Sequence, residues 1–201
     1  MKISVVLPAK NESAAVGFSI TRVRTVLPDA EILVVDDGST DDTAMQAQMA
    51  GARVIKHPYS KGNGAAIKTG ARLATGDCIV FMDADGQHDP ADIPRLLRGL
   101  DDDHDMVVGA RQKGSHASLG RGLANGLYNR LASWMTGHTV QDLTSGYRAV
   151  RAEKFREFLY LLPNGFSYPT TSTMAWINGR GVKYWPAPDL VSWAFFSSRP
   201  S

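Results

Sequence analysis

The sequence predicts an α/β fold with an open, mostly parallel, twisted sheet and helices on both faces. Short apolar runs alternate with helix-length stretches through the first half of the chain. Two of these runs, Ile32–Val35 and Cys78–Met82, are apolar on both faces, which is typical of buried parallel strands. Strand–helix–strand units of this kind connect through right-handed crossovers. Together these observations predict one sheet built from consecutive crossover units.

The expected elements follow in chain order, each strand being β-rich and bounded by turn residues. Strands are expected at 3–7, 32–35, 53–56 and 78–82, with helices at 14–27, 43–50 and 65–74, and a fifth strand at 106–109. After Gly109 the rhythm changes, and leucines spaced by four predict a longer helix at 119–135. Further helices are expected at 152–162 and 171–178, before a short strand at 182–185.

Length and composition narrow the class of protein. The 201 residues predict one domain, 1–201. Its organisation along the chain predicts a nucleotide-binding half at about 1–110, then a half at about 111–188 that forms the other wall of a cleft, and a tail at 189–201. The net charge of +2 is too small to indicate nucleic-acid binding, and a single cysteine, Cys78, excludes a disulfide framework. No signal peptide or membrane span is visible, which predicts a cytoplasmic protein. The sequence does not indicate an oligomeric state.

Polar and acidic residues follow each predicted strand of the first half. The segments are Pro8–Glu12, Asp36–Ser39, His57–Gly64 and Asp83–Gln87. In open α/β sheets, ligands bind beyond the carboxyl ends of the strands. Packing alone does not favour such a cluster, because neighbouring carboxylates repel and are costly to desolvate. The sequence therefore predicts a binding site at this edge.

The pair Asp83 and Asp85, directly after a buried strand, is the strongest local signal. With Gln87 as a third oxygen ligand, these carboxylates suit Mg²⁺ or Mn²⁺. The alternative is a helix-capping turn, because Asp89 and a proline follow immediately. If the chain stays extended, His88 points away from Gln87, and we expect it to face solvent.

Two other strand ends allow more than one interpretation. Asp36 and Asp37 suit the donor groups of a nucleobase and a ribose, or form a turn in which Ser39 or Asp41 caps the next helix. The segment Lys61–Gly64 precedes a helix, where backbone amides favour phosphate, although a flexible loop with a solvated lysine is equally compatible. The segment matches neither the P-loop nor the dinucleotide-binding pattern.

Taken in order, these segments resemble the family 2 glycosyltransferases, in particular the dolichol-phosphate-mannose synthase-like, polyprenyl-phosphate type. The resemblance covers roughly residues 3 to 188. It is carried by Val6–Glu12, Val34–Asp41, Lys61–Ala66, Phe81–His88, Gly109–Arg111, Asp142–Arg148 and Pro163–Phe166.

The resemblance implies a GT-A fold and inverting transfer of a hexose from a nucleotide-diphosphate sugar. It also implies roles for individual residues: Pro8, Ala9, Glu12, Asp36 and Asp37 at the base and ribose; Lys61 near the diphosphate; Asp83, Ala84 and Asp85 at the donor; Asp83, Asp85 and Gln87 at Mg²⁺ or Mn²⁺; and Arg111, Ser145 and Arg148 on the acceptor and phosphate side.

The expected chemistry separates charge, because the departing diphosphate gains negative charge. A cation held by Asp83 and Asp85 offsets that charge, which gives Asp85 a catalytic role. A phosphate acceptor arrives deprotonated, whereas a hydroxyl acceptor requires a base, for which Asp142 is the best candidate. The residue pattern around Asp142 favours its alternative role, which is capping of the turn at 144–146.

The expected acceptor is a polyprenyl phosphate at the cytoplasmic face of a membrane. The alternatives are a soluble hydroxyl acceptor, or a nucleotide-sugar-binding module without turnover. The apolar residues of 189–201 are compatible with docking on the domain, contact with lipid, or a tail without function.

Overall fold

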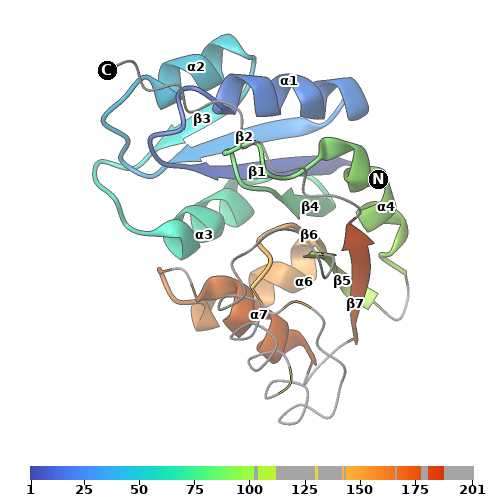
Figure 1. Ribbon diagram of the computed structural model, residues 1–201. Coiled ribbons are helices and arrows are strands. Elements are labelled where there is room, and N and C mark those ends of the chain that lie inside the picture. Colours follow the sequence, from blue (N-terminus) through green and yellow to red (C-terminus); the bar gives the residue numbers. More distant parts are fainter. Residues whose placement is uncertain are drawn as a thin grey trace.

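The computed structural model describes residues 1–101, 104–111, 130, 142, 144–165, 167–177 and 181–187. In this part of the chain the strands form one seven-stranded sheet in the order β3-β2-β1-β4-β6-β5-β7 (Figure 1). The strands are β1 (Ile3–Ala9), β2 (Glu31–Asp36), β3 (Arg53–Lys56), β4 (Cys78–Phe81), β5 (His104–Arg111), β6 (Arg148–Arg151) and β7 (Gly181–Ala187). The helices are α1 (Val16–Val26), α2 (Thr43–Met49), α3 (Asn63–Leu73), α4 (Ile93–Arg98), α6 (Ala152–Glu157) and α7 (Tyr168–Ile177), with 3₁₀ turns η1 (Pro90–Asp92) and η2 (Leu159–Leu161).

The first four strands pair in parallel, as the sequence predicts. Strand β1 lies at the centre of this group, with Val5 opposite Ile32 of β2 and Val80 of β4. It continues two residues past its expected end, because Pro8 and Ala9 still pair with β2. This extension carries the chain to the edge of the sheet where the predicted site lies.

Alternating side chains of β1 fill two different cores. Val5 and Leu7 pack with the apolar residues of α1, α2 and α4, whereas Val6 packs with those of α3, α6 and α7. Figure 1 shows α1 and α2 on one side of the sheet and α3 on the other. This two-residue period is what a strand buried on both faces requires. The expectation of helices on both faces is confirmed.

Strand β6 was not predicted, and it changes the sheet from parallel to mixed. It pairs antiparallel with both β4 and β5, while β7 pairs parallel with β5. Only two apolar residues separate Arg148 from Arg151, so the segment lacks the apolar run that signals a central strand. Its place in the sheet depends on the burial of Arg148, whose contacts come from distant residues.

The later helices differ from expectation at their ends. The helix expected at 152–162 is α6 followed by η2, and α7 begins at Tyr168, three residues earlier than predicted. Pro169 is tolerated there because the first turn of a helix leaves its amides unpaired. The helix predicted at 119–135 lies outside the described residues except for Arg130, and the tail at 189–201 also lies outside them. Among the described residues, no helix has the length and apolar character needed to cross a bilayer.

Candidate active site

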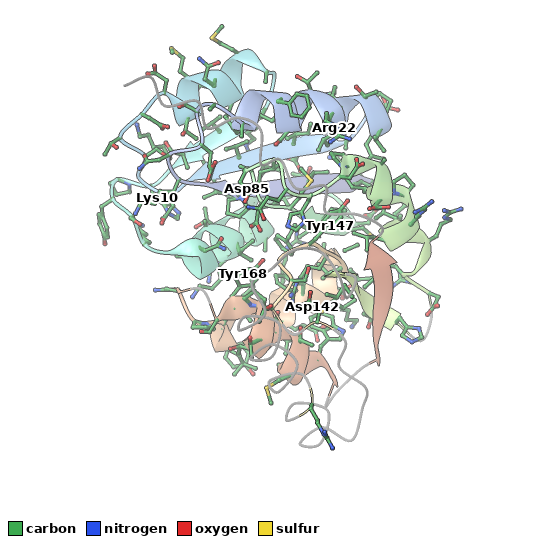
Figure 2. All side chains as sticks on the ribbon, viewed as in Figure 1. Lys10, Arg22, Asp85, Asp142, Tyr147 and Tyr168 are labelled. Carbon is green, nitrogen blue, oxygen red and sulfur yellow. The ribbon has the colours of Figure 1, made fainter. Side chains whose placement is uncertain are left out.

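A pocket of about 480 Å³ opens at the carboxyl ends of β1, β2 and β4. Figure 2 shows Asp85 at this edge of the sheet, with Tyr168 beneath it and Lys10 to one side. Segments far apart in the chain contribute to the wall, including residues 8–12, 60–66, 83–85, 144–146 and 168–169. The lining residues are Pro8, Ala9, Lys10, Glu12, Asp37, Ser60, Gly62, Asn63, Ala66, Asp83, Ala84, Asp85, Thr144, Gly146, Tyr168 and Pro169.

A left-handed turn after β1 places Glu12 on the pocket wall. Asn11 has a φ of 56°, a conformation that asparagine tolerates better than most residues. The backbone amide of Asn11 donates to Ser39 Oγ at 2.9 Å, and its side-chain Oδ1 accepts from the backbone amide of Thr40 at 2.9 Å. The amide of Glu12 donates to Thr43 Oγ1 at 2.8 Å. The loops that follow β1 and β2 therefore hold each other in place.

Three carboxylates on the pocket wall repel one another. Burial, and then the charge of Asp83, raise the pKa of Asp85. Burial also raises the pKa of Glu12, with further contributions from Asp85, Asp41 and Asp83. Both shifts have burial as their main cause and the neighbouring acids as a further one, so the ionised carboxylates are disfavoured in the pocket. A bound cation would favour the ionised forms, so the donor set fits a divalent metal.

The site is not a closed metal cage. Within the described ranges, no three His, Cys, Asp or Glu side chains come together as a metal-binding group. The side chain of Gln87 is exposed and does not line the pocket, although its backbone amide donates to Asp85 Oδ1 at 3.0 Å. Mg²⁺ and Mn²⁺ commonly use one or two carboxylates and complete their shell with phosphate oxygens and water. Asp83 and Asp85 match that mode of binding better than the expected set of three.

The prediction that His88 faces solvent is wrong. Its side chain is only 11% exposed, and its Nε2 lies 3.2 Å from Oδ2 of Asp83. Its ring stacks on Tyr147 at 4.8 Å between ring centroids. The prediction assumed an extended chain, but Gly86 has a φ of +79° and turns the backbone between Asp85 and His88. The turn brings the imidazole back against the first aspartate of the pair.

Asp37 lines the pocket, but both oxygens of its carboxylate accept hydrogen bonds from other groups of the protein. Oδ1 accepts from His57 Nδ1 at 2.7 Å and from the amide of Lys61 at 2.8 Å. Oδ2 accepts from Ser60 Oγ and from the amide of Gly62, both at 2.8 Å. Burial alone would raise the pKa of Asp37, but these hydrogen bonds outweigh it and lower the pKa to about 2. Asp37 thus anchors the loop that forms one wall of the pocket.

Asp36 lies deeper than its neighbour and does not line the pocket. Its side chain is fully buried, and Oδ1 accepts from the amide of Ser39 at 2.8 Å. This hydrogen bond makes a turn directly after β2. The expected helix cap is only approached, because α2 starts after Asp42, whose side chain makes no capping hydrogen bond, while Asp41 Oδ1 accepts from the amide of Thr43 at 3.0 Å. The placement of Asp36 supports a structural role within the loop after β2.

Two amides in the first turn of α3 donate to the loop at 163–165 rather than facing the pocket. The amide of Gly64 donates to the carbonyl of Gly165 at 3.2 Å, and that of Ala65 donates to the carbonyl of Asn164 at 3.1 Å. The Lys61 side chain is exposed, with Nζ 5.5 Å from the centre of the Tyr59 ring, and it does not line the pocket. The lysine side chain is exposed as the second interpretation expected, but the loop is not flexible, because the amides of Lys61 and Gly62 donate to the Asp37 carboxylate.

The residues expected on the acceptor side lie mostly behind the pocket wall. Arg148 is fully buried, and its guanidinium donates to Ser172 Oγ at 2.6 Å and to the carbonyls of Ser145 and Pro169. Ser145 is 4% exposed and donates its hydroxyl to the carbonyl of Gly109 at 2.7 Å. These placements fit structural roles rather than direct contact with an acceptor. Arg111 ends β5, and its side chain lies outside the described residues.

Asp142 is also buried, and it forms the turn considered as its alternative role. Its Oδ1 accepts from the amides of Thr144 and Ser145, both at 3.1 Å. The side chain is absent from the pocket lining, whereas Thr144 and Gly146 belong to it. Asp142 therefore shapes the segment that closes the pocket.

Several lining residues were not singled out from the sequence. Lys10 donates from Nζ to Ser60 Oγ at 2.9 Å, which links the loops after β1 and β3. Its position directly after the first strand was a usable signal. Asn63 lies in the segment at 57–64 that the sequence placed at this edge, whereas Tyr168 carried no comparable signal, because only the packing of α7 brings it to the pocket.

Comparison with known proteins defines the class. The fold matches a crystal structure of glucosyl-3-phosphoglycerate synthase from Mycobacterium tuberculosis in complex with Mn²⁺, UDP-glucose and phosphoglyceric acid, with a TM-score of 0.71 and 25% identity over 91% of this chain and 68% of that one. The chain is thus a glycosyltransferase with a GT-A fold. More narrowly, it belongs to glycosyl transferase family 2, whose profile matches residues 4–159.

Two relatives illustrate the family. An undecaprenyl-phosphate mannosyltransferase of Micrococcus luteus is 34% identical over 171 residues, which cover 78% of this chain and 69% of the relative. An undecaprenyl-phosphate 4-deoxy-4-formamido-L-arabinose transferase of Klebsiella pneumoniae is 35% identical over 160 residues, covering 75% of this chain and 49% of the relative. The chain thus spans about two thirds of the first relative and about half of the second.

Proposed function

We propose that this glycosyltransferase transfers a hexose from a nucleotide-diphosphate sugar, with inversion at the anomeric carbon, in a reaction that depends on Mg²⁺ or Mn²⁺. The observation that carries the proposal is the gathering of three carboxylates in the lining of one pocket. Glu12, Asp83 and Asp85 share one wall, and burial together with mutual repulsion raises the pKa values of Glu12 and Asp85. Such a wall would repel a diphosphate unless a cation lay between them.

Asp83 and Asp85 would hold the cation, and oxygens of the diphosphate would complete its coordination. When bound, the cation supplies Lewis-acid stabilisation of the charge that develops on the departing diphosphate. Burial disfavours the charged form of Asp85, and a bound cation would favour it. The M. tuberculosis enzyme was crystallised with Mn²⁺ and UDP-glucose, which supports both the metal and the donor class.

The nucleoside part of the donor would lie against the loops after β1, β2 and β3. Pro8, Ala9 and Glu12 line this region, and Asp37 fixes the loop opposite them. Because the carboxylate oxygens of Asp37 are engaged, we assign it a positioning role rather than direct recognition of the base. Asp36 and Lys61 then contribute through the shape of their loops.

A polyprenyl phosphate is the acceptor that the site supports best. A phosphate monoester arrives largely deprotonated, so its oxygen attacks the anomeric carbon from the side opposite the diphosphate without a general base. Asp142, the candidate base, is buried and bonded to two backbone amides. The Micrococcus and Klebsiella relatives are both named for undecaprenyl phosphate. We therefore place the reaction at the cytoplasmic face of a membrane.

A soluble acceptor with a hydroxyl group is the second candidate. The observation that favours it is the ligand set of the M. tuberculosis structure, which includes phosphoglyceric acid, a small compound that carries both hydroxyl and phosphate groups. In that case the proton of the attacking hydroxyl needs a carboxylate, and Asp142 would have to turn out of its capping position.

The test is transfer of radiolabelled sugar from UDP-hexose and GDP-hexose donors to undecaprenyl phosphate and to phosphoglyceric acid, with Mn²⁺ or with EDTA. We expect lipid-linked product only with the metal, and a loss of at least about 100-fold in Asp85→Asn. The control Asp29→Asn changes an exposed carboxylate outside the pocket and should retain full activity. Transfer that survives both EDTA and Asp85→Asn would refute the role of the metal.

A further inference from the structure

We propose that His88 is a positioning residue: its imidazole orients the carboxylate of Asp83 for the divalent cation. This inference rests on the proposed function, because it concerns the same cation. It assigns to this histidine a role that the sequence did not predict.

The imidazole of His88 is restrained by the ring of Tyr147 and by its hydrogen bond to Asp83. Its ring stacks on Tyr147, with an angle of 24° between the ring planes. Tyr147 is itself 2% exposed, and its hydroxyl donates to the carbonyl of Asp89 at 2.8 Å. The left-handed turn at Gly86 then sets the direction from which the imidazole approaches. The ring therefore has little freedom to leave the carboxylate.

The direction of the hydrogen bond follows from the charge of its partner. An ionised carboxylate only accepts hydrogen bonds, so Nε2 of His88 carries the hydrogen and donates it to Asp83 Oδ2. The other lone pairs of the carboxylate remain available to the pocket, where the Asp83 side chain is 38% exposed. His88 is much less exposed and so acts from behind the carboxylate.

Gly146 leaves room for the same carboxylate. A Cβ atom at position 146 would lie 3.2 Å from Oδ2 of Asp83, which is tighter than ordinary van der Waals contact. The absence of a side chain at residue 146 therefore lets the carboxylate keep the position in which His88 contacts it. The hydrogen bond from His88 reduces the side-chain freedom that metal binding would otherwise have to remove.

This arrangement has a measurable consequence for metal affinity. Carboxylates that bind metals are usually hydrogen-bonded in turn, and loss of such a partner typically weakens metal affinity or activity by about 10–100-fold. A purely structural His88 would instead contribute by packing against Tyr147. The two roles are separable, because the donor and the aromatic face can be removed independently.

The experiment compares His88→Phe, which keeps an aromatic ring on Tyr147 but has no donor, with His88→Gln, which keeps an N–H donor but loses the ring. Binding of Mn²⁺ is measured by electron paramagnetic resonance, with the metal alone and in the presence of UDP or GDP. Thermal unfolding and the Mn²⁺ concentration for half-maximal transfer are measured in parallel. We expect His88→Phe to weaken Mn²⁺ binding by about 10–100-fold and to raise the half-maximal concentration, with kcat at saturating Mn²⁺ little changed. His88→Gln should bind Mn²⁺ within about threefold of the wild type.

Three outcomes would overturn the inference. If His88→Phe binds Mn²⁺ like the wild type while Asp83→Asn does not bind it, His88 has no positioning role and the proposed function stands. Equal losses in His88→Phe and His88→Gln would assign the effect to packing and not to the donor. If the wild type binds no Mn²⁺ and transfers sugar in EDTA, the inference fails together with the metal dependence of the proposed function.

Discussion

Gly146 and Asp83 both line the pocket, and they lie so close that a side chain at residue 146 would crowd the Asp83 carboxylate. A Cβ atom added at residue 146 would lie 3.2 Å from Oδ2 and 3.4 Å from Oδ1 of Asp83, and 3.5 Å from the hydroxyl of Tyr168. Asp83 follows β4 and Gly146 precedes β6, and the antiparallel pairing of Phe81 with Arg148 brings both to the same end of this strand pair. A side chain at position 146 would therefore act directly on a proposed metal ligand.

Gly146→Ala should weaken Mn²⁺ binding with little effect on folding. The added methyl group forces the Asp83 carboxylate to move by a few tenths of an ångström, and small misplacements of reacting groups are costly in rate. We expect about a 10-fold loss of Mn²⁺ affinity, measured by titration. Gly165→Ala is the matched control, because its Cβ meets nothing within 4 Å. Equal Mn²⁺ affinity in both variants would show that Asp83 tolerates the displacement.

Asp37→Asn should destabilise the protein at neutral pH. The amide group of asparagine cannot accept from all four donors around Asp37, and the backbone amides of Lys61 and Gly62 would lose charged acceptors. We expect a decrease of about 3 kcal/mol in the free energy of unfolding, measured with urea at pH 7.

The effect of Asp37→Asn on the free energy of unfolding should depend on pH. The pKa of Asp37 is lowered from 3.8 to about 2 in the folded state. The stabilisation by the ionised form is therefore fully present above about pH 4 and is lost as the pH falls towards 2. The stability difference between wild type and Asp37→Asn should shrink over that interval. A difference that stays constant would show that the carboxylate charge is not the source of the stability.

Gly64→Ala should disrupt the contact between α3 and the loop at 163–165. A Cβ atom at position 64 would lie 2.1 Å from the carbonyl oxygen of Pro163, and backbone cannot move aside as a flexible side chain does. We expect a loss of about 3 kcal/mol in the free energy of unfolding. The control Gly17→Ala, inside α1 with the nearest atom 3.9 Å from its Cβ, should stabilise the protein by about 0.5–1 kcal/mol. Wild-type stability in Gly64→Ala would contradict the close approach.

Arg148→Lys should affect stability more than acceptor binding. Lysine cannot reproduce the planar set of donors that reaches Ser172 and the carbonyls of Ser145 and Pro169. We expect a loss of about 3 kcal/mol in the free energy of unfolding, with the KM for undecaprenyl phosphate within about threefold of the wild type. Unchanged stability with a raised acceptor KM would instead place Arg148 at the acceptor phosphate.

Asp142→Asn distinguishes the two acceptor classes. Asparagine retains a carbonyl oxygen that accepts from the amides of Thr144 and Ser145, so the turn should remain intact. With a phosphate acceptor we expect transfer within about threefold of the wild type, whereas loss of a general base typically costs about 10²–10⁴-fold. Parallel assays with undecaprenyl phosphate and phosphoglyceric acid separate these results. A large loss with the lipid acceptor would contradict its use without a base.

Much of the first half of the fold was predictable because its signals are local. The apolar runs of β2 and β4 are buried on both faces and need no knowledge of their partners. Asp83 and Asp85 were identifiable because acids that directly follow a buried strand reach the carboxyl edge of the sheet. Strand β6 was not predictable, since the burial of Arg148 requires acceptors supplied by α7. The division into halves at about residue 110 stays a prediction.

By itself, the sequence determined the class of fold, the edge of the sheet at which the pocket opens and the aspartate pair at that edge, because all three depend on residue patterns within short segments. Only the tertiary structure decided which carboxylates are available to a ligand in the pocket and which accept hydrogen bonds from the protein itself. Asp37 is saturated by a loop some twenty residues later, the amides at the start of α3 are bonded to the loop at 164–165, and His88 is turned back onto Asp83. In each case the hydrogen bond depends on partners that lie far away in the chain, or on a backbone turn such as the one at Gly86. Patterns within short segments do not contain that information.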